Sequence, residues 1–137
     1  MEAETAQGTS EPTIGRDGDG SALGNISRRI VGLHKEYYGR GPTKAKTYHN
    51  GDLVVVLMRG GFTRVEETLF DKGRGDSVTK QRADFQEVMG ERFKEVIENE
   101  LGRAVVAVIS GSHQHPDLLS EVFVLESAEV LIDDGAD

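Results

Sequence analysis

The chain has 137 residues, a formal net charge of −8 and no cysteine. This length fits one compact domain, and the lack of cysteine excludes disulfides, thiol catalysis and cysteine-ligated zinc. No apolar run reaches the roughly 18–20 residues that a helix needs to span a bilayer, and the N-terminus lacks the basic and apolar regions of a signal peptide. We therefore expect a cytoplasmic protein without direct membrane insertion.

Charge is distributed unevenly along the chain. Residues 1–22 contain five acidic residues and one arginine, and residues 126–137 contain five acidic residues and no basic one. The first segment has no hydrophobic period, so burial of apolar surface cannot offset the entropy lost on ordering it. We predict disordered acidic tails at 1–22 and 128–137, and one folded domain at 23–127.

The folded domain is predicted to begin with a helix. Between residues 26 and 37, apolar side chains recur at helical spacing. Ser21 or Asn25 is a suitable N-cap, and Gly39 and Gly41 favour an end to the helix.

A hairpin is predicted next. Residues 43–49 alternate in polarity, and Asn50-Gly51 connects them to the apolar run 53–58. Asn-Gly between two strand-like segments is a strong hairpin signal, because both residues tolerate positive φ. The run 53–58 is apolar on both faces, which is typical of a central strand.

Two helices are predicted to follow. Thr63 and Glu66 have the spacing of a capping box, with Val65 and Leu69 on the buried side of a short helix. A longer helix is expected from Val78 to Leu101, and Gly102 stands where a glycine C-cap belongs. Its predicted apolar stripe comprises Phe85, Val88, Met89, Phe93, Val96, Ile97 and Leu101.

Two further strands complete the predicted fold. Residues 103–110 are expected to form a second central strand, residues 112–117 a polar turn, and residues 120–126 a final strand. The order α-β-β-α-α-β-β predicts an α+β domain. Its four-stranded, largely antiparallel sheet would consist of two hairpins with helices packed on one face.

A basic surface is the strongest electrostatic feature of the sequence. Residues 28–64 contain eight basic residues against two acidic ones, and Lys44, Lys46 and Tyr48 share one face of a predicted strand. Such a face suits a protein partner or a small anion; nucleic-acid binders usually show a larger basic excess. Two structural explanations compete: edge-strand lysines deter aggregation, and the acidic long helix can face this patch.

Other chemistry has weaker support. The segment GRGPTK lacks the spacing of a phosphate-binding loop and precedes a strand instead of a helix. His113, His115 and Asp117 are weak metal-ligand candidates, since imidazole and carboxylate groups are common ligands. No set of residues has the arrangement of nucleophile, base and orienting group that catalysis requires, so we expect neither an enzyme nor a cofactor.

Three stretches resemble the MpsC-like family of prokaryotic proteins: GRGP before the hairpin, G-G-F-T-x-x-E-x-x-L at 60–69, and the region from Arg82 to residue 126. The resemblance covers about residues 23–127. It implies an accessory protein of a membrane system that translocates sodium and is also linked to inorganic-carbon uptake.

Three functional hypotheses follow. The first is a non-catalytic, homodimeric accessory or regulatory protein that binds a membrane ion or bicarbonate transport subunit, and so lies at the membrane through that partner. Its tentative docking or anion-binding residues are Arg40, Lys44, Lys46, Tyr48 and Arg82. The second is a sensor of bicarbonate or a phosphorylated metabolite, held by Arg40, Lys44 and Arg82. The third is a metal-dependent enzyme centred on His113, His115 and Asp117.

Overall fold

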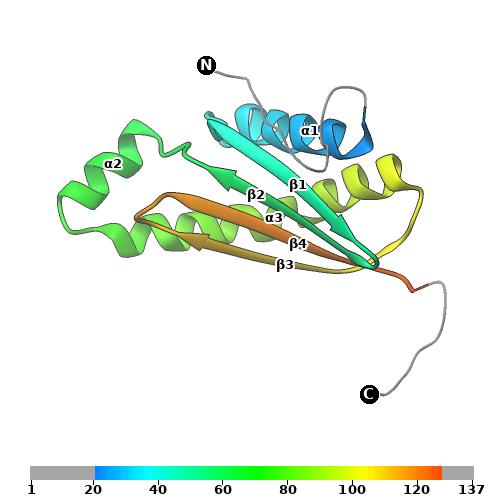
Figure 1. The fold of residues 1–137 in the computed structure, drawn as a ribbon. Coiled ribbons are helices and arrows are strands. Elements are labelled where there is room, and N and C mark those ends of the chain that lie inside the picture. Colours follow the sequence, from blue (N-terminus) through cyan, green and yellow to red (C-terminus); the bar gives the residue numbers. More distant parts are fainter. Residues whose placement is uncertain (1–20, 128–137) are drawn as a thin grey trace.

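A computed structural model describes residues 21–127 of the chain (Figure 1). The elements in chain order are α1 (Ala22–Tyr37), β1 (Lys44–Asn50), β2 (Leu53–Arg59), α2 (Arg64–Asp71), α3 (Gly75–Leu101), β3 (Val105–His113) and β4 (Leu118–Leu125). This order and the α+β class confirm the prediction. Of the predicted tails at 1–22 and 128–137, residues 1–20 and 128–137 lie outside the described residues. Residues 21 and 22 correct the first prediction, because Ser21 caps α1 and Ala22 begins it.

The four strands form one antiparallel sheet in the order β1-β2-β4-β3. The first hairpin turns through Gly51 and Asp52, with Asn50 paired to Leu53. Gly51 has a φ of +62°, a left-handed conformation that glycine adopts without steric cost. The strand order corrects one expectation: β3 is an edge strand, and β4 is central because it pairs with both β2 and β3.

Helices α1 and α3 both pack on one face of the sheet, which we call the inner face (Figure 1). Alternate residues of the central strands point into this layer, as the period of two requires. The buried hydrophobic core comprises Ile26, Ile30, Val54, Val56, Met58, Met89, Phe93, Val96, Ile97, Val105, Leu119, Phe123 and Leu125. The prediction that helices cover one face is confirmed.

Local sequence signals set most of the helix ends. The Ser21 hydroxyl accepts a hydrogen bond from the Gly24 amide at 2.9 Å and caps α1. Thr63 and Glu66 form the predicted capping box of α2. Gly102 ends α3 in the left-handed conformation with a φ of +68°. The start of α3 is different from the prediction, because the helix begins at Gly75 and includes the turn before Val78.

Two predicted core residues are exposed. Val65 is 64% exposed and Val88 is 77% exposed. On α2 the buried residue is Glu66, and on α3 the buried stripe passes through Arg82 and Gln86. On α3 the other six predicted stripe residues are buried or pack against the core, so the predicted orientation is right and only Val88 is misplaced. On α2, where the buried position is polar, the apolar pattern misplaced Val65.

Candidate functional site

A buried ion-pair cluster connects α2, α3 and the β3–β4 turn. Arg82 Nε and Nη2 donate to the two oxygens of Glu66, each at 3.2 Å, and Nη1 donates to Asp117 Oδ1 at 2.8 Å. Arg82 is 4% exposed and Glu66 is fully buried. The Arg82 guanidinium also lies 4.1 Å from the centre of the Phe62 ring, a cation–π contact. One arginine is therefore neutralised by two carboxylates inside the protein.

Glu66 has a donor for each of its acceptor sites. Oε1 accepts the Thr63 amide at 2.9 Å as well as Arg82, and Oε2 accepts the Tyr38 hydroxyl as well as Arg82. Burial alone raises the pKa of Glu66, but the hydrogen bonds from Arg82, Tyr38 and the Thr63 amide outweigh it and hold the pKa below its usual value. The carboxylate therefore stays ionised and fully hydrogen-bonded.

Tyr38 extends this cluster to the end of α1. Its hydroxyl donates to Glu66 and accepts a hydrogen bond from Gln81 Nε2 at 2.9 Å. Burial and the neighbouring Glu66 carboxylate raise the pKa of Tyr38 to about 12. Tyr38 therefore remains a neutral donor over the physiological pH range, and it fixes the C-terminal end of α1 against α2 and α3.

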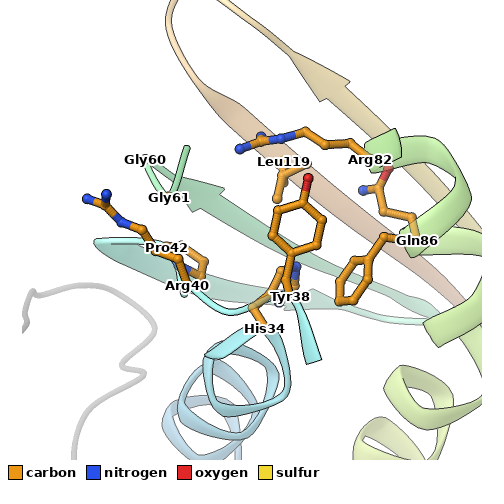
Figure 2. A pocket seen from close by; sticks show the side chains of 10 residues that line it. His34, Tyr38, Arg40, Pro42, Gly60, Gly61, Arg82, Gln86 and Leu119 are labelled. Atoms are coloured by element: carbon orange, nitrogen blue, oxygen red, sulfur yellow. The ribbon is translucent and has the colours of Figure 1, made fainter. Parts of the chain in front are cut away.

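A small hollow lies beside the cluster (Figure 2). His34, at its base, is 2% exposed; its Nδ1 donates to the Ile30 carbonyl at 3.0 Å, and its Nε2 has no hydrogen-bond partner in residues 21–127. Burial lowers the pKa of His34, so Nε2 is an unprotonated acceptor. The volume of about 10 Å³ holds at most one water molecule. This hollow is too small for a metabolite.

A second buried carboxylate, Glu121 on β4, has only neutral partners. It is fully buried and accepts hydrogen bonds from the Ser110 hydroxyl and from Gln86 Nε2, the latter at 2.8 Å. Burial raises the pKa of Glu121 to about 7, although these two hydrogen bonds act in the opposite direction. Unlike Glu66, Glu121 is near its titration midpoint at neutral pH.

The three weak metal candidates do not converge. His113 Nδ1 donates to the Pro116 carbonyl at 2.8 Å, the His115 ring packs 5.1 Å from the Phe70 ring, and Asp117 holds Arg82 and the Phe62 amide. Within residues 21–127 no group of three or more histidine, aspartate or glutamate side chains is arranged to bind a metal ion.

The face of the sheet opposite α1 and α3, which we call the outer face, carries most of the predicted docking residues. Directly paired residues of antiparallel strands share a face. The register therefore places Tyr48, Val55, Val122 and Ile109 in one row across all four strands. Residues two or four positions away along the same strands point to the same face, and they add Leu53, Leu57, Leu118 and Val124 to it.

One end of the outer face is basic. Lys44 pairs with Arg59, and Lys46 pairs with Leu57, in the register of β1 and β2. Lys44 and Arg59 are exposed, and Lys46 lies 5.7 Å from the centre of the Tyr48 ring. These three are the charged side chains of the outer face in the described strands, and all are positive. The outer face is therefore an apolar surface with a basic end.

The predicted anion-binding residues are not equivalent. Arg82 is committed to Glu66 and Asp117, whereas Arg40 and Lys44 are exposed and form no ion pair with a described residue. Arg40 also lines the hollow, and Figure 2 shows its side chain extending away from Arg82. The structure does not combine these three cations around one anion.

Sequence analysis assigned Glu66 to a capping box but not to a buried ion pair, and it did not single out Glu121, although signals for both existed. Arg82 lies four residues before Gln86 in the buried stripe of a long helix, so it required an acidic partner. Glu121 shares the period-two phase of Leu119, Phe123 and Leu125 on a central strand. Both signals mark a buried polar position, but neither identifies the residue that contacts it.

Comparison with known proteins identifies the family. Residues 19–127 match the family described as "Na+-translocating membrane potential-generating system (MpsC)", and the chain belongs to this family, as the resemblance implied. Neither a curated protein nor a solved structure matches the chain. Of the helices in residues 21–127, none has both the length and the hydrophobicity needed to cross a membrane.

Proposed function

We propose that this chain is a non-catalytic accessory component of the Na⁺-translocating system for which its family is named, and that it binds another protein through the outer face of its sheet. The observation that carries the proposal is the outer face itself, which is not covered by α1 or α3, since both pack on the opposite face (Figure 1). Leu53 is 43% exposed, Tyr48 45% and Ile109 59%, on a face whose charged side chains are basic. Contiguous exposed apolar surface of this kind is typical of protein interaction sites.

The interior supports binding over catalysis. Glu66 is fully hydrogen-bonded and has a lowered pKa, and the hollow lined by its partners Tyr38 and Arg82 has a volume of only about 10 Å³. A general base needs access to its substrate and a pKa near the working pH. Glu121 has a pKa near neutrality but is completely buried. These groups are better explained as supports for the fold.

The partner's chemistry follows from the charges. Lys44, Lys46 and Arg59 lie at one end of the outer face, next to the apolar rows that contain Val55 and Val122. A complementary surface is apolar at its centre and carries aspartate or glutamate opposite the basic end. Rim charges of this type mainly increase the association rate and make binding sensitive to salt. The partner we propose is a cytoplasmic surface of a membrane subunit of the same system.

Capture of that subunit from detergent-solubilised native membranes tests the proposal. We expect the tagged full-length chain to retain the membrane subunits of the Na⁺-translocating system, and retention to fall when salt is raised. The double variant Lys44→Glu/Arg59→Glu is expected to lose most of this retention. A control with the same change in net charge is Arg64→Glu/Lys72→Glu; Arg64 begins α2, Lys72 is its C-cap, and both residues are exposed. Equal retention by both variants would contradict a role for the outer face.

A further inference from the structure

The β3 edge of the sheet has no charged side chain to prevent strand pairing. Residues 104–112 contain no lysine, arginine, aspartate or glutamate, and Val106 and Ile109 are 62% and 59% exposed. Natural proteins usually protect a free edge with charges, proline or a covering element. The opposite edge, β1, carries Lys44 and Lys46. A register irregularity between Val105 and Ala107 interrupts this edge near its start. From Ala107 to Ser112 the edge carries no charge, proline or covering element from residues 21–127, so another strand can extend the sheet there.

We propose that the occupant of this edge is a second copy of the chain. In this arrangement β3 pairs antiparallel with β3 of the second copy around a two-fold axis, and the two sheets become one eight-stranded sheet. An antiparallel pairing of one strand with itself is self-complementary, as a two-fold interface requires. We place the axis at Ile109, the midpoint of β3 (Val105–His113), because the pairs from Ala107 to Gly111 around it lie beyond the register irregularity between Val105 and Ala107.

Side-chain size agrees with this axis. The first half of β3, residues 105–108, contains three valines and one alanine, and the second half, residues 110–113, contains Ser110, Gly111, Ser112 and His113. The two-fold axis places each half opposite the other half of the second copy. Val108 then opposes Ser110, Val106 opposes Ser112 and Ala107 opposes Gly111. Apart from Ile109, which opposes its own equivalent at the axis, no two bulky residues meet except Val105 and His113 at the ends, which favours close packing near the axis.

Charges on α3 agree with the same axis. Gln86 Nε2 donates to the Gly111 carbonyl at 3.1 Å, so this part of α3 lies level with the second half of β3. Lys94 is seven residues after Glu87, or about 10.5 Å along the helix, which corresponds to about three strand residues. Glu87 is therefore level with residues 110–111, and Lys94 with residues 107–108. Ile109 lies midway between them.

The axis consequently brings opposite charges together. Glu87 of one copy lies level with Lys94 of the second copy, and the reverse contact forms at the same time. Both residues line a groove of about 320 Å³ between α3 and β3, together with Val106 and Val108. Because the paired β3 strands are about 4.8 Å apart, the two α3 helices lie beside each other and enclose these grooves.

One contact in this arrangement is unfavourable. Glu91 also lines the groove, and it lies between Glu87 and Lys94 at the level of the axis. The two copies therefore bring Glu91 close to its own equivalent, which costs binding through like-charge repulsion. Removal of the Glu91 charge should therefore strengthen the dimer. An interface that does not bring Glu91 close to its own equivalent predicts no such effect.

Sedimentation of the full-length chain over a concentration series tests the pairing. We expect the chain to form a dimer. We expect Val106→Lys to raise its dissociation constant at least about tenfold, because each copy then carries a lysine on its edge strand, and edge lysines oppose strand pairing. Val65→Lys is the matched control: Val65 is 64% exposed on α2, far from β3 in sequence and on another element. A chain that stays monomeric at every concentration overturns the proposal, as does a dimer that both variants affect equally.

Charge reversal identifies the axis. Glu87→Lys and Lys94→Glu should each weaken the dimer by about tenfold, since each replaces two attractive contacts by repulsive ones. The double variant should restore the original dissociation constant, and Glu91→Gln should lower it. Failure of the double variant to recover overturns the two-fold arrangement. These substitutions avoid Lys44 and Arg59, so this result and the membrane capture succeed or fail separately.

Discussion

The two faces of the sheet distribute their charges in opposite ways. The inner face buries Glu121 of β4, and on the same side of the sheet the helices bury Glu66 of α2 and Arg82 of α3. Each charged atom of these three side chains has a protein partner. The outer face exposes Lys44 and Arg59 beside apolar rows, with no acidic side chain in the described strands. Inner charges therefore serve stability, whereas Lys44 and Arg59 of the outer face are exposed and can meet a partner.

This difference teaches how one small domain separates folding from binding. A buried ion pair gives little net stability compared with apolar packing, but loss of one partner is costly. Exposed charges hardly affect stability but strongly affect association. Changes to the inner face should consequently alter unfolding, and changes to the outer face should alter partner capture.

The largest expected effect is at Arg82. Arg82→Met leaves Glu66 ionised and buried without its main partner, so we expect the free energy of unfolding to fall by about 3–5 kcal/mol. The control is Lys80→Met on the same helix, where an exposed ion pair to Asp84 contributes at most about 0.5 kcal/mol. Urea denaturation measures both; equal losses would contradict a structural role for the buried cluster.

The second effect concerns the pH dependence of stability. The pKa of Glu121 rises from 4.5 when unfolded to about 7 when folded, so the folded state binds a proton more readily. Its contribution to stability is present below pH 4.5 and declines as the pH rises through the folded pKa. The decline is about 3 kcal/mol at most, at about 1.36 kcal/mol per pKa unit.

The Glu121→Gln variant isolates that contribution. Its free energy of unfolding should lack the decline between pH 4.5 and about 7. The comparison with the wild-type chain is needed because His34 also contributes to the pH dependence of stability, in the opposite direction. Its pKa is lowered in the folded state, so its contribution to stability is lost as the pH falls. Identical pH profiles for the two proteins would show that Glu121 does not titrate in this way.

A smaller effect is expected at Tyr38. Tyr38→Phe removes one donor from the Glu66 carboxylate, and we expect a loss of about 1.5–3 kcal/mol, the range for hydrogen bonds to charged groups. The neighbouring Tyr37 is 46% exposed, so Tyr37→Phe provides a control with the same chemical change. Thermal denaturation should show a lower melting temperature for Tyr38→Phe than for Tyr37→Phe. Equal melting temperatures would mean that the Tyr38 hydroxyl does not stabilise the cluster.

The smallest expected effect on stability is at the basic end of the outer face. Lys44→Glu and Arg59→Glu should each change the free energy of unfolding by less than about 0.5 kcal/mol, because both side chains are exposed. Together they should nevertheless abolish most of the membrane capture. A large loss of stability in this variant would mean that the two faces are not independent.

The sequence predicted the elements better than their arrangement. Gly51, the Thr63–Glu66 capping box and Gly102 act within a few residues, so their consequences were visible locally. The position of β3 at the edge was not visible, because it depends on the pairing of β2 with β4, which are about 60 residues apart.

The same limit applies to the candidate site. Lys44, Lys46 and Tyr48 were placed correctly on one face of an edge strand, since strand periodicity fixes that relation. Arg82 was singled out, but its contacts with Glu66 and Asp117 come from three separate elements. Val88 was assigned to the core because it is apolar, whereas packing buried Arg82 and Gln86 instead.

The central claim is that the inner and outer faces carry separable tasks. The most direct test measures the retention of membrane subunits by Glu121→Gln and by Lys44→Glu/Arg59→Glu at equal concentrations of folded protein. We predict full retention by the inner-face variant and loss of retention by the outer-face variant. Loss in the inner-face variant with full retention by Lys44→Glu/Arg59→Glu would contradict the account.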